Sequence, residues 1–150
     1  MSDRLDLDPL RKLRKYPHLE PLDTAIWNAW LDTDPWPDAV VAYDVHVGTV
    51  ATVADGTPEN YRRMVEHLST LRIDVVVVRP GVTLVVEIKP SASLSAIGQA
   101  LGYSLLFRDQ YPDYPKPTPA ILTDLSKPDT SWLCNRLNVQ LFTLGRPITG

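Results

Sequence analysis

The sequence contains almost no cysteine and no long hydrophobic run. Cys134 is the single cysteine in 150 residues, so no disulfide can form within the chain, and it belongs to no spacing typical of a metal site. We interpret it as a small buried apolar residue. No apolar segment approaches the roughly 18–20 residues of a membrane helix, and the first ten residues lack the apolar stretch of a signal peptide. We therefore expect a soluble, cytoplasmic protein without a membrane partner.

An excess of charge of one sign is also missing. Eighteen acidic and 15 basic residues give a net charge of −3, which argues against broad, nonspecific adhesion to polyanions. One local basic segment lies near the N-terminus and consists of Arg11, Lys12, Arg14 and Lys15. This segment is either a solvated charged end or an arm that contacts nucleic-acid phosphates.

Glycine is scarce beside proline, with 7 glycines and 14 prolines. Hydrophobic residues make up 44% of the chain and charged residues 22%, which is typical of a globular protein. A chain of this length corresponds to one domain and buries enough surface to fold without a disulfide or metal. We predict a single domain over residues 1–150.

Hydrophobic periodicity predicts an alternation of helices and strands. Residues 71–78 and 82–89 form a hairpin around Pro80 and Gly81, and both strands are apolar on both faces, so helices should cover them. We expect residues 110–119, which contain four prolines, to be a stiff surface loop. The predicted fold class is α/β, with a central mixed β-sheet flanked by helices. The predicted helices are 21–33, 57–68, 94–108 and a weak segment around 132, and the predicted strands are 41–47, 71–78, 82–89, 120–123 and 139–144.

The helix at 94–108 is expected to begin at Ser93 as its N-cap and to pack on the sheet through one apolar stripe. Gly98 and Gly102 are four residues apart and should allow a close approach to the strands. Each lowers helix propensity by about 1 kcal/mol, a cost that implies a role in packing or in function. Gln99 and Tyr103 share a neighbouring face. The predicted stripe consists of Leu94, Ile97, Leu101 and Leu105.

Two carboxylates interrupt the valine-rich hairpin, where an unpaired charge would be costly. If Arg79 pairs with Val82, the register places Asp74 directly opposite Glu87, with their Cβ atoms about 5 Å apart. Like charges at this distance favour a proton or a cation between them, and Mg²⁺ or Mn²⁺ is the natural occupant. Lys89 shares the face of Glu87, while Ile88 points away and leaves its carbonyl oxygen available to the ion. The alternative is a structural ion pair that joins Asp74 and Arg72.

These residues together resemble a known family. Asp74, then Glu87-Ile88-Lys89, then the Gln99-x-x-x-Tyr103 helix are similar to the PD-(D/E)XK nuclease superfamily, in its RecB-like branch. The resemblance is most specific over residues 72–106. It implies that Asp74 and Glu87 hold Mg²⁺, that Lys89 assists the attacking water, and that Gln99 and Tyr103 line the DNA-contacting face. We add Arg72 and the basic segment as candidate DNA contacts.

The sequence departs from the family pattern at several positions. Ile73 precedes Asp74 where the pattern has proline, and the acid that many members add from the first helix has Glu20 as its only nearby candidate. Glu20 is either a metal ligand or an acid that stabilises a helix N-terminus. We interpret His18 and His46 as incidental polar residues. Trp27 and Trp30 are interpreted as core residues rather than base-stacking platforms.

Two functional hypotheses follow from the resemblance. The first is a Mg²⁺-dependent DNA nuclease that hydrolyses phosphodiester bonds, of a small stand-alone type associated with phages and their hosts. The second is a non-catalytic virion protein with a nuclease-like fold, such as a phage neck or connector component with head or tail proteins as partners, which the slightly acidic balance favours. The carboxylate pair favours the first hypothesis, because an inactive site has no physical need for two repelling carboxylates.

Overall fold

Two valine-rich strands joined by a tight turn form the centre of the molecule. In the computed structural model, which describes residues 4–48, 52–69 and 71–145, these strands are β3 (Leu71–Arg79) and β4 (Val82–Ser91). Arg79 pairs with Val82, and the antiparallel ladder continues to Val75 opposite Val86. Gly81 has a φ of 74°, which a glycine adopts without strain, so the predicted turn and register are confirmed.

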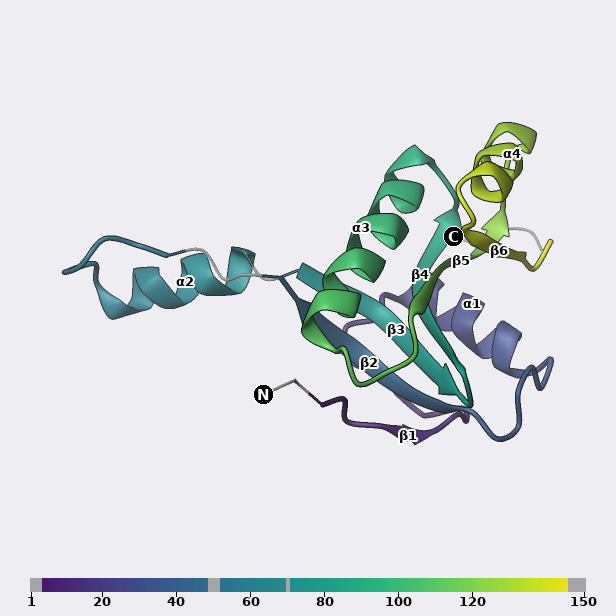
Figure 1. Ribbon diagram of the computed structural model, residues 1–150, viewed down its shortest axis with the longest axis horizontal. Coiled ribbons are helices and arrows are strands. Elements are labelled where there is room, and N and C mark those ends of the chain that lie inside the picture. Colours follow the sequence, from purple (N-terminus) through teal and green to yellow (C-terminus); the bar gives the residue numbers. More distant parts are fainter. Residues whose placement is uncertain (1–3, 49–51, 70, 146–150) are drawn as a thin grey trace.

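The described strands form one mixed sheet in sequence order, so the predicted α/β fold class is confirmed (Figure 1). Neighbouring strands from β1 to β4 are antiparallel, whereas β4, β5 and β6 are parallel to one another. The parallel strands therefore end at the same edge as Lys89 and Ser91, which belong to β4. The remaining strands are β1 (Asp8–Pro9), β2 (Val40–Val47), β5 (Pro117–Leu125) and β6 (Gln140–Thr143).

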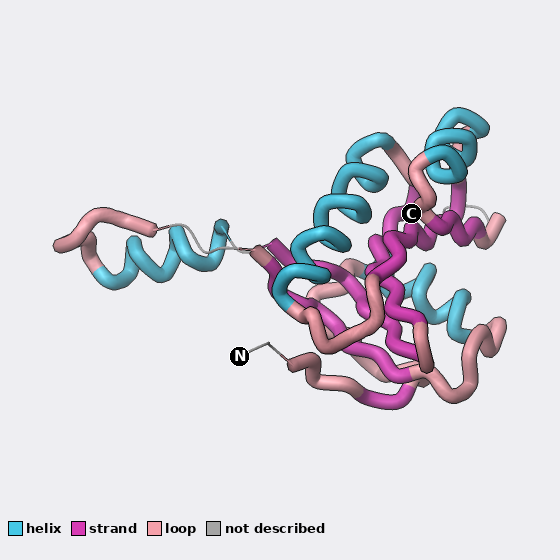
Figure 2. Tube along the Cα trace, viewed as in Figure 1, coloured by secondary structure: helices cyan, strands magenta, loops and turns pink. Residues whose placement is uncertain are grey.

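Helices cover both faces of this sheet (Figures 1 and 2). On one face, α1 (Pro21–Leu31) packs against the sheet through Ile26, Trp27 and Trp30. On the other, α3 (Leu94–Gln110) lies across the strands, and α4 (Pro128–Arg136) lies beside it near β6. The helix α2 (Glu59–Ser69) stands apart from these layers. No helix in the described ranges is long and apolar enough to cross a membrane.

The core confirms several predictions about single residues. Trp27 and Trp30 are buried on the α1 face, and Cys134 is a buried free thiol between α3, α4 and the sheet. Ser93 is the N-cap of α3, where its side chain accepts a hydrogen bond from the backbone N–H of Ala96. Local sequence signals were sufficient here because capping and helical spacing are short-range properties.

The predicted packing stripe of α3 is wrong at two of its four residues, since Ile97 and Leu101 pack in the core whereas Leu94 and Leu105 are exposed. Leu94 and Leu105 are 70% and 69% exposed, and of the four predicted residues Ile97 alone is buried. The buried face consists of Ala96, Ile97, Ala100, Ser104 and Phe107, because small side chains let the helix lie close to the sheet. Gly98 and Gly102 do not serve this close approach, since a Cβ atom on either would meet no other atom within 4 Å.

Two strand boundaries also differ from the predictions. The proline-rich loop is shorter than residues 110–119, because Pro117 and Pro119 already belong to β5 and pair with β4. The pairing of β5 with β6 begins only at Ala120, so the first residues of β5 lie at an edge of the sheet. A proline without an N–H group is tolerated at such an edge position. The strand β1 was not predicted, since two residues are too short to show any periodicity.

Candidate active site

Two neighbouring strands break their alternation at an aspartate. In β2, Val41 and Tyr43 pack on the α1 face, whereas Val45 and Val47 pack on the α3 face. The change occurs at Asp44, which has a φ of 53°, a left-handed conformation that few residues other than glycine adopt. The odd-numbered apolar residues of β2 therefore lie on both faces of the sheet, whereas strict alternation would place them on one face.

The same change of face occurs in β3 at Asp74. Val75 and Val77 pack on the α1 face, whereas Ile73 packs on the α3 face. The register between β2 and β3 omits the pair Asp44 and Asp74, although both flanking pairs are present. Backbone groups at this break are free to bond elsewhere, so the break makes room for polar chemistry inside an apolar sheet.

Asp74 and Glu87 meet where the ladder between β3 and β4 ends. A carboxylate oxygen of Asp74 accepts a hydrogen bond from the backbone N–H of Ile88 at 3.0 Å. In the other direction, the backbone N–H of Asp74 donates to the Glu87 carboxylate. These crossed bonds bring the two side chains together, as the predicted register required.

Burial and mutual repulsion make this pair reluctant to carry two negative charges. Glu87 is 3% exposed, and burial followed by the nearby Asp74 carboxylate raises its pKa to about 8. Burial also raises the pKa of Asp74, although the hydrogen bond from Ile88 and the charge of Lys89 oppose this shift. Oε1 of Glu87 is buried without a hydrogen-bond partner in the described residues. Such an atom requires a proton or a cation.

Two other predicted active-site residues, Lys89 and Tyr103, lie near the pair. Lys89 is half-buried, and its ammonium lowers the pKa values of both Asp74 and Glu87. Tyr103 approaches the pair from α3. Burial raises the pKa of its phenol, and the nearby Glu87 and Asp74 carboxylates raise it further. Gln99, one turn earlier, holds a buried Oε1 without a partner in the described part of the chain. Their catalytic and DNA-contacting roles stay predictions.

An acid from the first helix also faces the pair, and it is Asp23 rather than Glu20. Burial and then the Asp74 carboxylate raise the pKa of Asp23 to about 6, and the Lys89 charge lowers it. Glu20 is the exposed N-cap residue of α1. We did not predict Asp23, although its sequence position held a signal. It precedes Ile26 by three residues and Trp27 by four, so it lies on the buried stripe of the helix.

Asp44 contacts both His18 and His46, which we interpreted as incidental polar residues. Nε2 of His18 lies 3.1 Å from Oδ2 of Asp44, and Nε2 of His46 lies 3.6 Å from the same oxygen. The guanidinium of Arg72 lies 3.6 Å from Oδ1 of Asp44 and contacts the His18 ring. Arg72 thus forms an ion pair with Asp44, which itself raises the pKa of Asp74. These residues form a second layer next to the carboxylate pair.

The basic segment lies on the surface between β1 and α1. Arg11, Lys12, Arg14 and Lys15 are all exposed. Lys12 forms an ion pair with Asp32 at 3.0 Å, so part of the positive charge of the segment is already neutralised. Tyr16, which follows the segment directly in sequence, is buried in the core on the α1 face and so holds the segment against the protein. Whether it contacts DNA stays a prediction.

The donor atoms of the site suit a hard divalent cation. Within the described ranges, no group of three or more histidine, cysteine, aspartate or glutamate side chains is arranged to hold a metal ion by itself. Magnesium needs fewer protein ligands, because it keeps several waters and is commonly bound through one or two carboxylates and substrate phosphates. The partnerless oxygen of Glu87 fits such a site.

Comparisons with known proteins show distant structural similarity alone. No family model matches the chain, and no curated protein matches it in sequence. A repair endonuclease from Pyrococcus abyssi is 16% identical over 70% of this chain, with a TM-score of 0.44. A protein of unknown function, AF1548, is 14% identical over 84% of this chain, with a TM-score of 0.46. This chain spans 40% of the first structure's chain and 59% of the second's.

Proposed function

We propose that the protein is a Mg²⁺-dependent deoxyribonuclease that hydrolyses phosphodiester bonds, with Mn²⁺ as an alternative ion. The observation that carries the proposal is the buried pair of Asp74 and Glu87, with Lys89 beside it and a partnerless oxygen on Glu87. Evolution of a stable fold alone would not place repelling carboxylates in the centre of a valine-rich hairpin, because burying them is unfavourable. An ion and a phosphodiester that use these charges explain their presence.

Each side chain has a defined task in this proposal. Asp74 and Glu87 would hold the ion, with Asp23 as a third carboxylate nearby and the Ile88 carbonyl oxygen as a main-chain ligand. A bound Mg²⁺ supplies positive charge that makes water a better nucleophile and stabilises the phosphoryl oxygens. Lys89 donates hydrogen bonds that orient the attacking water and the phosphate. Tyr103 and Gln99 position the DNA strand from α3.

The direct test is incubation of the purified protein with linear DNA, closed circular DNA and RNA, in Mg²⁺, in Mn²⁺ and in EDTA. We expect DNA cleavage with either ion and none in EDTA, and cleavage of the closed circle would identify an endonuclease. Asp74→Asn, purified in parallel, controls for a contaminating nuclease. Intact DNA in every condition, or equal cleavage by this variant, would refute the proposal.

The position of Asp23 beside the carboxylate pair predicts a difference between two acids of α1. Asp23→Asn should raise the Mg²⁺ concentration that gives half of the maximal stabilisation by roughly 10-fold or more, because losing a partner next to the metal ligands commonly lowers metal affinity by this amount. Glu20→Gln should leave it within about twofold, since Glu20 is exposed at the N-cap. The measurement is the melting temperature as a function of Mg²⁺ concentration. A larger effect of Glu20→Gln would return the ligand role to Glu20.

A non-catalytic role as a virion component is the second candidate. The observation that favours it is the large apolar side chains exposed on helices, including Leu105 on α3 and Met64 on α2. Exposed apolar residues that form a contiguous patch mark protein interaction sites. The cleavage assay separates the two candidates, because a structural protein would leave DNA intact with either ion.

A further inference from the structure

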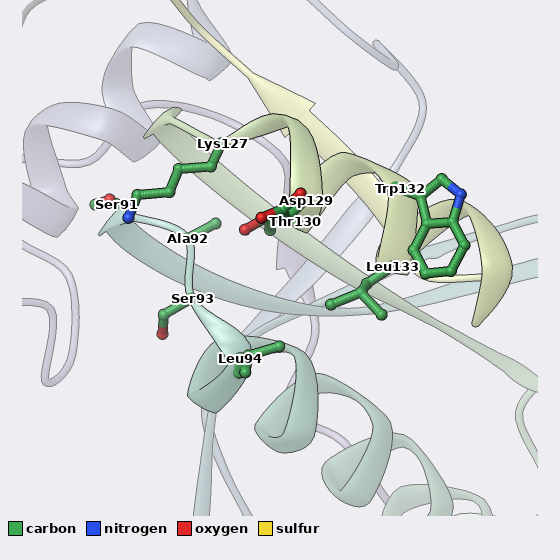
Figure 3. Close-up of a pocket in the computed structure, with 9 residues that line it drawn as sticks. All are labelled: Ser91, Ala92, Ser93, Leu94, Lys127, Asp129, Thr130, Trp132 and Leu133. Carbon is green, nitrogen blue, oxygen red and sulfur yellow. The ribbon is translucent and has the colours of Figure 1, made fainter.

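A cavity of about 590 Å³ lies between the start of α3 and the first turns of α4 (Figure 3). We name it the α3–α4 cleft. One wall is the connection from the end of β4 into α3, and the other wall is the beginning of α4. This volume lies in the range of sites that bind small molecules and single nucleotides. The residues used below are Ser91 and Leu94 on the first wall and Lys127, Asp129, Thr130 and Trp132 on the second.

The cleft adjoins the candidate active site along one strand, since its lining includes Ser91, two residues after Lys89. Lys89 and Ser91 both belong to β4, and they pair with Thr123 and Leu125 of β5. Two residues along a strand correspond to about 7 Å, and their side chains point to the same face. A DNA strand whose phosphate lies at Lys89 would therefore place a neighbouring nucleotide at the entrance of the cleft.

The entrance of the cleft is apolar and exposed. Trp132 is 59% exposed and Leu94 is 70% exposed. The Arg136 guanidinium lies 5.0 Å from the centre of the Trp132 ring, an arrangement that orients the indole and adds positive charge beside it. Aromatic rings next to a positively charged path are the usual platform on which unpaired bases stack.

The polar groups of the cleft match a base better than a phosphate. Thr130 is 7% exposed and lines the cavity, and its hydroxyl can both donate and accept hydrogen bonds. Asp129 presents a carboxylate, which would repel a phosphate but accepts hydrogen bonds from the amino and N–H groups of a base. Lys127, at the N-cap of α4, supplies a cation for the phosphate backbone of the DNA strand outside the cleft.

We propose that the α3–α4 cleft binds an unpaired nucleobase of the DNA strand, so that the substrate contains a single-stranded segment next to the scissile phosphate. A paired base cannot enter a cleft of this kind without leaving its stack. The inference rests on the proposed nuclease function for its orientation, but base binding in the cleft can be measured without any cleavage.

The test measures binding in EDTA, where no hydrolysis occurs. A labelled oligothymidylate of 12 residues and a blunt duplex of equal length are titrated with the parent protein, Trp132→Ala, Trp132→Phe and Leu105→Ala. Trp132→Ala should weaken oligothymidylate binding by roughly 10- to 100-fold, the effect of losing one stacked base. Trp132→Phe keeps a ring and should stay within about threefold of the parent. Leu105→Ala, an equally exposed apolar residue outside the cleft, should have no effect.

A second readout follows the cleft directly. Trp27 and Trp30 are buried, and Trp36 is half-buried against the same core on the α1 face. Quenching of tryptophan fluorescence by oligothymidylate should therefore come mainly from Trp132 and should be lost in Trp132→Phe. Equal affinity of parent and Trp132→Ala for oligothymidylate would overturn the proposal, as would an equal loss for the blunt duplex. If the cleft binds bases but no DNA is cleaved with Mg²⁺, the nuclease function fails while the cleft assignment stands.

Discussion

Replacing Lys89 with alanine is expected to lower Mg²⁺-dependent DNA cleavage by about 10²-fold or more, the usual consequence of losing a positioned catalytic group. The ammonium of Lys89 acts on Asp23, Asp74 and Glu87 together, so it lies at the centre of the site. Its removal takes away the group that orients water and offsets charge on the phosphate. It removes little packing, because the side chain is half-buried at the end of β4.

The measurement is the cleavage rate as a function of Mg²⁺ concentration. A catalytic role lowers the maximal rate, whereas a role in metal binding alone shifts the Mg²⁺ requirement and leaves the maximal rate intact. Lys116→Ala is the matched control, since Lys116 is exposed in the loop before β5. If Lys89→Ala cleaved as fast as the parent, Lys89 would be a structural residue.

Glu87→Gln is expected to stabilise the metal-free protein at pH 8 and to remove the part of its pH dependence that Glu87 causes. The pKa of Glu87 rises from an ordinary value of 4.5 to about 8 in the folded protein. Between these values the folded protein keeps a proton that the unfolded chain has released. The stabilising contribution is therefore complete below about pH 4.5 and is lost as the pH rises towards 8. Glutamine imitates the protonated glutamate side chain but does not titrate, so the variant does not lose this stability as the pH rises.

The expected size of this effect is a few kcal/mol at pH 8, since one group changes stability by at most about 1.4 kcal/mol per pH unit. For a chain of this length, it corresponds to a melting temperature roughly 5–10 °C above that of the parent. Mg²⁺ should stabilise the parent by about 2.7 kcal/mol at a hundredfold excess over its dissociation constant, and Glu87→Gln should lose most of this gain.

Thermal unfolding between pH 5 and 8, with EDTA and with Mg²⁺, provides the measurement. Asp109→Asn is the control, because Asp109 is exposed on α3 and its substitution should leave the slope unchanged. A metal-free Glu87→Gln protein that melts well below the parent at pH 8 would show that the carboxylate stabilises the fold. In that case the proposed metal site would lose its main support.

The sequence by itself determined the central hairpin, and with it the pairing of Asp74 with Glu87. The turn at Pro80 and Gly81 and the valine-rich strands are local signals, and a hairpin has one register for a given turn. The start of α1 at Pro21 and the Ser93 cap of α3 were predictable for the same reason, since capping and helical spacing act within a few residues.

Only the tertiary structure decided how distant residues meet at this hairpin. Asp23 reaches the carboxylate pair from the opposite face, and Asp44 gathers His18, His46 and Arg72, which are up to 54 residues apart in sequence. The positive φ of Asp44 and the changes of face at Asp44 and Asp74 leave no periodic signal, because alternation describes regular strands. The α3–α4 cleft depends likewise on the small buried face of α3, which leaves Leu94 exposed. Packing between elements, rather than pattern within them, determines these features.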